Sequence, residues 1–249
     1  MNRIAMITGG TGGIGLATAK ALGQAGYDII LNGISEEQAA TAQEELKALD
    51  INVEVFLFDV TDEEKVIENF KLISEKYDHL DVLVNNAGGL GGRSRFEDME
   101  TSFYRKVMAL NLDSVFFNTR AAIPMLKKGT NPSIVNFTSI AGWNSGGPGA
   151  GIYGTSKAGV TTMTRALAKD LAEYGIRVNA VSPGTIDTAF HQQIKETNIE
   201  VFNSWKNNIL LKRLGEASEV ASVIEFLVSE KASFLTGEII QINGGQAFI

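Results

Sequence analysis

Tyr153 and Lys157 stand four residues apart in the stretch "YGTSK". Residues spaced i and i+4 share one face of a helix, so these two side chains can interact. An ammonium beside a phenol favours the phenolate, and Lys157 is therefore expected to lower the pKa of Tyr153 from its usual value of about 10. A tyrosine tuned in this way can transfer a proton near neutral pH. On spacing alone, an ordinary pair on a helix surface explains the same residues, so the surrounding elements must decide.

Two further polar residues could take part in the same chemistry. Ser139 follows an apolar run, where its hydroxyl could stabilise charge on a substrate oxygen. Spacing does not distinguish it from the adjacent Thr138. Asn111 lies in "ALNLDS", within a helical stretch expected over residues 100–128. Its amide could equally be a local feature that kinks the helix.

Short apolar runs alternate along the chain with longer helical patterns. The runs expected to form strands cover residues 3–8, 27–32, 52–58, 81–85, 133–139, 176–182 and 238–243. Several are apolar at nearly every position, which is typical of a parallel sheet covered on both faces. Capping boxes at Ser35–Gln38 and Thr61–Glu64 predict helices that run to about Leu49 and Tyr77. The sequence predicts one doubly wound α/β domain of the Rossmann type, with a seven-stranded parallel sheet and helices on both faces.

The first strand runs into a glycine-rich turn, "TGGTGGIG", that opens a helix. In such a fold, ligands bind beyond the carboxyl ends of the strands, and a helix N-terminus attracts an anion. This context favours the pyrophosphate of a dinucleotide over a purely structural turn. The acidic residue that commonly follows the second strand is missing, since Gly33 occupies its place and Glu36 and Glu37 are expected to begin the next helix. No cation stands nearby for a 2′-phosphate, so NAD(H) and NADP(H) both stay open, with a slight lean to NAD(H).

Composition excludes several other classes of function. The chain of 249 residues contains no cysteine and only two histidines, so no metal site is expected. A formal charge of −7 argues against nucleic-acid binding. No apolar run is long enough for a membrane span or a signal peptide, and a cytoplasmic protein that binds a small-molecule substrate is expected.

Taken together, these motifs resemble the short-chain dehydrogenase/reductase superfamily nearly end to end. The resemblance also covers "DV" at 59–60, "NNAG" at 85–88, "PG" at 183–184 and "NGG" at 243–245. It implies that Tyr153 is the general acid or base, Lys157 its partner on the nicotinamide ribose, Ser139 a donor to the substrate oxygen, and Asn111 the support of a water beside Lys157. The cofactor-binding positions it implies, besides Tyr153 and Lys157, are Gly9, Thr11, Gly13, Ile14, Gly15, Gly33, Asp59, Val60, Asn86, Ala87, Gly88, Pro183, Gly184, Ile186 and Thr188. Without the resemblance, Asp59 could equally be a turn residue at the end of its strand.

The resemblance further implies a homotetramer and a substrate lid at residues 189–215 within the single domain 1–249. Phe190, His191, Phe202 and Trp205 could line the pocket beneath that lid, or anchor an ordinary helix pair. We hypothesise that Arg93 helps to select an anionic or polyhydroxy substrate, although a solvated surface arginine explains it as well.

The predicted activity is the interconversion of a secondary alcohol and a ketone by hydride transfer. Bacterial members with similar motifs include 3-oxoacyl-carrier-protein reductases and sugar-type dehydrogenases. Candidate substrates are therefore hydroxy acids such as sugar acids, 3-oxoacyl thioesters and steroid-like alcohols. One alternative is a dinucleotide-binding regulator without turnover, which usually lacks the tyrosine or the lysine. Another is an epimerase or dehydratase, which usually carries an additional substrate domain.

Overall fold

The chain forms a seven-stranded sheet in which every neighbouring pair of strands is parallel. The computed structural model describes residues 2–188 and 199–248. The strands are β1 (Arg3–Ile7), β2 (Tyr27–Gly33), β3 (Val53–Leu57), β4 (Val82–Asn85), β5 (Ser133–Phe137), β6 (Arg177–Pro183) and β7 (Ile239–Ile242). Their order across the sheet is β3-β2-β1-β4-β5-β6-β7. The chain order reverses between β1 and β4, the position where such sheets bind ligands.

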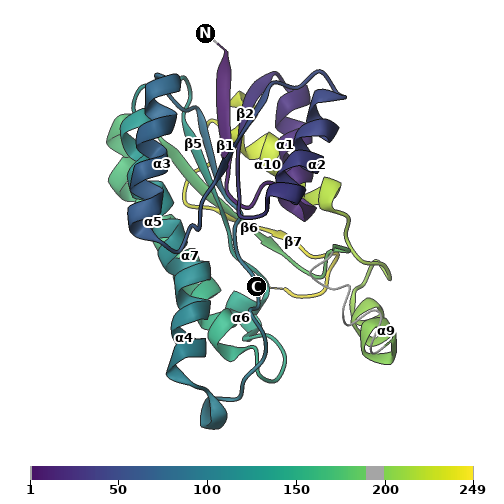
Figure 1. Cartoon of the computed structure of the whole chain (residues 1–249). Coiled ribbons are helices and arrows are strands. Elements are labelled where there is room, and N and C mark those ends of the chain that lie inside the picture. The colour runs from purple at the N-terminus through teal and green to yellow at the C-terminus, as the bar shows by residue number, and fades with distance from the viewer. Residues whose placement is uncertain (1, 189–198, 249) are drawn as a thin grey trace.

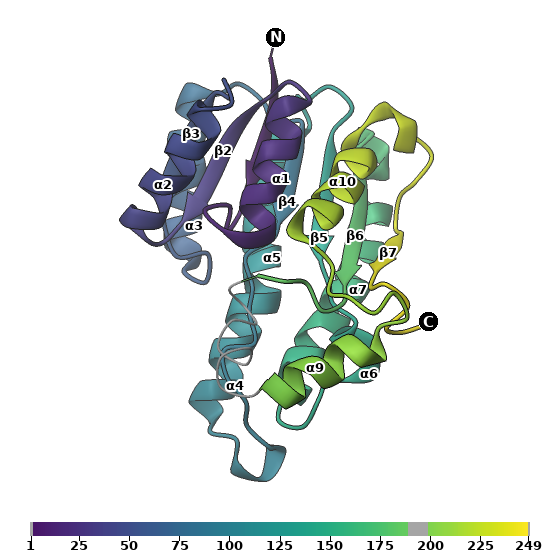
Figure 2. The same cartoon turned by 90° about the vertical axis from the view of Figure 1, so that its right-hand side faces the viewer.

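Helices cover both faces of the sheet, as predicted (Figure 1). The helices on one face are α1 (Gly13–Gln24), α2 (Glu36–Lys47) and α10 (Ala217–Val228), and those on the other are α3 (Glu63–Lys76), α5 (Ser114–Leu126) and α7 (Gly151–Leu171). A separate apolar core fills each interface between sheet and helices. The shorter helices α4 (Thr101–Met108), α6 (Ala141–Asn144) and α9 (Ile199–Asn208) lie beyond the carboxyl edge of the sheet (Figure 2). Three short 3₁₀ turns lie at Phe96–Asp98, Ala172–Tyr174 and Glu230–Ala232.

Two helix boundaries differ from the sequence prediction. The cap of α3 is Asp62, whose carboxylate accepts a hydrogen bond from the Lys65 amide at 3.1 Å. Thr61 was the predicted cap, but its backbone and hydroxyl both donate to Asp59. The single helix predicted over 100–128 is divided into α4 and α5 by a π-helical turn at Ala109–Asp113.

Among the described residues, no helix is long and apolar enough to cross a membrane.

Candidate functional site

The glycine-rich turn between β1 and α1 is tightly folded. Gly9 has a positive φ of 59°, and a Cβ atom on Gly15 would lie 2.4 Å from the Gly9 carbonyl oxygen. Only glycine at position 15 permits this approach without displacing the turn. The first turn of α1 has no side-chain cap and no acidic residue. Its backbone N–H groups and positive dipole end are therefore available to an anion, and they fit a pyrophosphate.

Asparagine side chains hold this turn against the neighbouring strands. Asn32, at the end of β2, accepts from the Gly9 amide at 3.2 Å and donates to the Phe58 carbonyl at 2.9 Å. Asn86 donates to the carbonyls of Thr8 and Gly9, both at 2.9 Å. The side-chain nitrogen of Asn86 is thus occupied by the glycine-rich turn. Asn86, which was predicted to contact the cofactor, therefore supports the turn that would bind it. Sequence reasoning missed Asn32, although a polar residue that ends an apolar strand was a usable signal.

The missing acidic residue after β2 has a steric cause. A Cβ atom on Gly33 would lie 2.6 Å from the Thr11 Cγ2 methyl. Thr11 therefore fills the space that a side chain at position 33 would need. The next residue, Ile34, is 79% exposed, so an apolar surface replaces the usual carboxylate at this place.

Two of the predicted cofactor contacts, Asp59 and Val60, differ from each other in the structure. Asp59 is exposed, and one of its carboxylate oxygens accepts from the Thr61 amide and hydroxyl, both at 2.8 Å. Asp59 is therefore a turn residue at the end of its strand, which was one of the two alternatives that the sequence left open. The Val60 side chain is buried in the core on the α3 side. Only the backbone of Val60 can contact a nucleotide, which narrows the predicted role.

Ser139 and Tyr153 are brought together by close packing of α6 on α7. A Cβ atom on Gly154 would lie 2.7 Å from the Ala141 carbonyl oxygen, and one on Gly142 would lie 3.0 Å from the Ala158 nitrogen. Both glycines therefore allow the backbones of the two helices to touch. Ser139 lies just before α6, and Tyr153 lies in the first turn of α7. The small residues after Tyr153 thus include one, Gly154, that packs against α6.

Lys157 and Asn111 are buried beside the loop that follows β4. The Lys157 Nζ atom donates to the Phe137 carbonyl at 2.9 Å and lies 5.8 Å from the centre of the Tyr153 ring. Asn111, in the π-helical turn, accepts from the Gly89 amide at 2.9 Å and donates to the Gly89 carbonyl at 2.8 Å. A Cβ atom on Gly88 would lie 2.9 Å from Asn111 Oδ1 and 3.1 Å from Lys157 Nζ. The loop therefore runs directly against both side chains.

Burial sets the pKa values of the central pair. It raises the pKa of Tyr153 above its ordinary value, and the Ser139 hydroxyl, as a hydrogen-bond partner, opposes this in part. Burial also lowers the pKa of Lys157 to about 8. The prediction that Lys157 lowers the pKa of Tyr153 is wrong for the protein on its own. The reason is that loss of solvation destabilises the phenolate, while the ammonium is directed at the Phe137 carbonyl.

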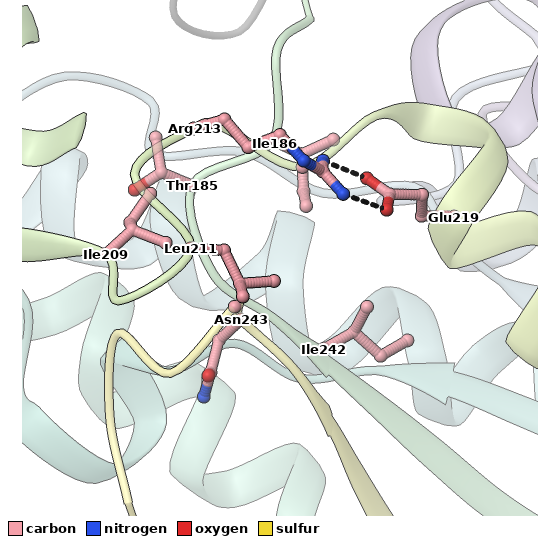
Figure 3. A pocket seen from close by; sticks show the side chains of 10 residues that line it. Thr185, Ile186, Ile209, Leu211, Arg213, Glu219, Ile242 and Asn243 are labelled. Carbon is pink, nitrogen blue, oxygen red and sulfur yellow. Dashed lines mark hydrogen bonds and ion pairs between the residues drawn. The ribbon is translucent and has the colours of Figure 1, made fainter.

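The loop after β6 forms one wall of the site. Thr188 approaches the glycine-rich turn, since a Cβ atom on Gly13 would lie 3.8 Å from the Thr188 methyl. The Ile186 side chain points elsewhere, into the core on the α10 side and into a cavity of about 70 Å³. Figure 3 shows this cavity, with the ion pair between Arg213 and Glu219 at its rim. It is too small for a dinucleotide, because ligand sites usually measure several hundred Å³. The predicted cofactor contact of Ile186 can therefore come only from its backbone.

The predicted lid is described only in part. Phe190 and His191 lie outside the described residues. Phe202, on α9, is buried, and the chain after α9 returns to the end of β7, where the Leu211 amide donates to the Gly244 carbonyl at 3.2 Å. An open groove lies beside the start of α7, between residues 94–97 and 145–151. Arg93 spans these two segments, because its guanidinium donates to the Pro148 carbonyl at 2.9 Å.

The chain is similar over nearly its whole length to known reductases and dehydrogenases. The family described as Enoyl-(Acyl carrier protein) reductase matches residues 9–247. The 3-oxoacyl-(acyl-carrier-protein) reductase FabG of Thermotoga maritima is 39% identical over 247 residues, which cover 98% of this chain and 97% of the relative.

Solved structures give the same result. A short-chain dehydrogenase/reductase of Brucella melitensis, described as a glucose/ribitol dehydrogenase, has a TM-score of 0.91 at 34% identity and covers 100% of this chain and 98% of its own. An NADH-dependent reductase responsible for alginate metabolism has a TM-score of 0.90 at 34% identity, with the same coverage. The chain therefore belongs to the short-chain dehydrogenase/reductase family, and it is an oxidoreductase that interconverts a ketone and an alcohol with a nicotinamide dinucleotide.

Proposed function

We propose that Tyr153, Ser139 and Lys157 form the catalytic centre, and that Asn111 positions it. The observation that carries this proposal is a chain of contacts: Ser139 is a hydrogen-bond partner of Tyr153, the Lys157 Nζ atom lies 5.8 Å from the centre of the Tyr153 ring, and Lys157 and Asn111 meet at Gly88. When bound, the cofactor supplies or accepts the hydride. The residues proposed to hold it lie in the glycine-rich turn (Gly9, Thr11, Gly13, Ile14, Gly15), at the ends of β2, β3 and β4 (Gly33, Asp59, Val60, Asn86, Ala87, Gly88) and in the loop after β6 (Pro183, Gly184, Ile186, Thr188).

The proton chemistry follows from the pKa values. Because burial raises the pKa of Tyr153, its hydroxyl is protonated at neutral pH and can donate a proton to a substrate carbonyl oxygen. Ser139 donates a hydrogen bond to the same oxygen as negative charge develops there. With a pKa of about 8, Lys157 is mostly charged at pH 7, and its ammonium is held by the Phe137 carbonyl, 5.8 Å from the centre of the Tyr153 ring. The free protein is thus set for ketone reduction.

Asn111 acts through the backbone in this proposal. Its amide is paired with Gly89 on both sides and also donates to the Val107 carbonyl at 3.0 Å. These contacts fix the π-helical turn relative to the loop that carries Gly88. The support of a water beside Lys157, which the family resemblance implies, would therefore fall to backbone atoms of the turn.

NAD(H) is the proposed cofactor. A 2′-phosphate needs cationic partners, whereas the residues after β2 are Ile34, Ser35, Glu36 and Glu37, and the two carboxylates stand in the first turn of α2. The Ser35 hydroxyl is engaged as the cap of that helix, since it accepts from the Gln38 amide. A titration of both reduced cofactors tests this proposal: tighter binding of NADPH than of NADH would contradict it.

The proposed substrates are 3-oxoacyl thioesters, with sugar-derived ketones second. The first class is supported by the name of the Thermotoga maritima relative, and the second by the alginate-metabolism reductase. The open groove at residues 94–97 and 145–151 is compatible with an extended chain. We would assay both classes at the absorbance of the reduced nicotinamide, beside a Tyr153→Phe control that keeps the ring. Loss of turnover with cofactor binding retained is expected, and turnover unaffected by this change would refute the proposed mechanism.

A homotetramer in the cytoplasm completes the proposal. The exposed aromatic side chains that could mediate assembly are Tyr104 and Phe116 near α4 and α5, and Phe226, Phe234 and Phe248 near α10 and the chain end. The cytoplasm is proposed because it holds the dinucleotide pool that the reaction needs. Light scattering on the purified protein would measure the mass of the assembly.

A further inference from the structure

The last residues of the described chain form a compact turn with its own internal hydrogen bonds. Asn243, just after β7, accepts from the Gly245 amide at 2.9 Å and donates to the Ala247 carbonyl at 3.0 Å. Gly244 and Gly245 both have positive φ values, 59° and 79°, which glycine adopts without strain. The backbone N–H of Gln246 closes the turn by donating a 2.9 Å hydrogen bond to the backbone carbonyl of Asn243.

This turn directs the Gln246 side chain at the loop after β6. The Thr185 backbone amide donates to Gln246 Oε1 at 2.9 Å. The Thr185 hydroxyl lies 3.2 Å from Oε1 and 3.0 Å from Nε2. A Cβ atom on Gly184 would lie 2.6 Å from Gln246 Oε1 and 2.8 Å from Asn243 Cβ. The turn and the loop are therefore in direct contact at two successive residues, Gly184 and Thr185, and Thr185 is 61 positions away from Gln246 in the chain.

We infer that Gln246 is a positioning residue for the cofactor-binding loop at Pro183–Thr188. This inference rests on the proposed cofactor-binding role of that loop, which the family resemblance assigns to the nicotinamide end. Thr185 is buried, so its amide has to find an acceptor within the protein, and Gln246 supplies one. Three residues further on, Thr188 lies against the glycine-rich turn. Fixing Thr185 therefore fixes where the loop meets the pyrophosphate-binding turn.

The test compares binding of the whole dinucleotide with binding of AMP, which carries only the adenosine end. Gln246→Met keeps the length of the side chain and removes its acceptor. We expect it to weaken NADH binding about tenfold, equivalent to about 1.4 kcal/mol, and to leave AMP binding unchanged. Gln246→Glu keeps an acceptor for the Thr185 amide and should retain most of the affinity. Gln241→Met on β7 is the matched control, because the Gln241 Oε1 atom is buried and has no hydrogen-bond partner in the described structure.

Dissociation constants come from the fluorescence of bound NADH, and those of AMP from calorimetry. Equal NADH affinities for wild type and Gln246→Met would overturn the inference. So would an equal loss of NADH and AMP binding, which would indicate a general loss of structure, or a loss with Gln246→Glu as large as with methionine. If the wild-type protein binds AMP but gains nothing from the nicotinamide half, the proposed role of the loop fails instead.

Discussion

Lys157 is expected to destabilise the free protein at neutral pH. Burial lowers its pKa from 10.5 to about 8, so the folded state releases a proton that the unfolded chain retains between these values. A difference of about 2.5 in pKa corresponds to about 3 kcal/mol, at 1.36 kcal/mol for each pH unit. The physical source of this penalty is the transfer of an ammonium out of water, which the single Phe137 carbonyl offsets only in part. Replacing the charge with an apolar group of similar length should remove it.

Lys157→Met should therefore raise the free energy of unfolding at pH 7 by about 3 kcal/mol or somewhat less, since the Phe137 carbonyl loses its partner. The sign of the pH dependence is fixed by the direction of the shift. Because the folded pKa lies below the unfolded one, wild-type stability should rise as pH increases through about 8 toward 10.5. The advantage of the methionine variant should shrink over the same window and be constant below it.

The measurement is urea unfolding of cofactor-free protein at several pH values from 6 to 10, for wild type, Lys157→Met and Lys169→Met. Lys169 lies on the same helix with an exposed side chain, so its replacement should leave the profile parallel to that of the wild type. Taking differences between variants cancels the titration of all other groups that are unaffected by the change. A Lys157→Met variant that is less stable than wild type at pH 7, or a stability difference independent of pH, would refute the reasoning.

Two further predictions concern the walls of the site. Gly15→Ala should lower the free energy of unfolding by about 1–3 kcal/mol and abolish NADH binding, because the new Cβ would lie 2.4 Å from the Gly9 carbonyl oxygen. Gly12→Ala is the control, since no atom lies within 4 Å of the new Cβ. It should leave the denaturation midpoint unchanged. Arg93→Ala should raise KM by about two- to tenfold for neutral and acidic ketones alike, since its exposed guanidinium holds the Pro148 carbonyl and such a bond contributes about 0.5–1.5 kcal/mol. A rise in KM confined to carboxylate substrates would instead favour the reading of Arg93 as an anion selector.

The sheet was predictable because its strands are apolar on nearly every position and are separated by helices with readable start signals. All seven strands appear within two residues of their expected ends, and α2 begins directly after the predicted cap, Ser35. The sequence offered a kink at Asn111 only as one alternative and did not predict the π-helical turn at Ala109–Asp113, since "ALNLDS" keeps helical periodicity. Its stabilisation comes from Gly89, which is distant in sequence and whose peptide group pairs with Asn111. Tertiary hydrogen bonds of this kind leave no local trace.

The supporting contacts of the site were the least predictable part. The roles of Asn32 and Gln246 depend on which backbone groups the fold leaves without partners, and that is known only once the loops are placed. Gly154 packs against the Ala141 carbonyl of α6, a contact that its small size permits. A small residue on a helix predicts close contact, but the sequence does not identify the contacting segment.

The sign of the Tyr153 pKa shift separates what spacing can predict from what burial decides. A spacing of four residues places Lys157 near the ring, and an ammonium at that distance would favour the phenolate in water. In the folded chain the tyrosine loses more by desolvation than it gains from its neighbours, so its pKa rises. A general acid needs the protonated phenol at the start of ketone reduction, and burial provides it. Alcohol oxidation needs the phenolate instead, and the positive charge of an oxidised nicotinamide nearby would lower the same pKa. The rate of alcohol oxidation should therefore reach half of its maximum at a pH below the pKa of Tyr153 measured in the cofactor-free protein. If the two values coincide, the cofactor does not change the pKa of Tyr153.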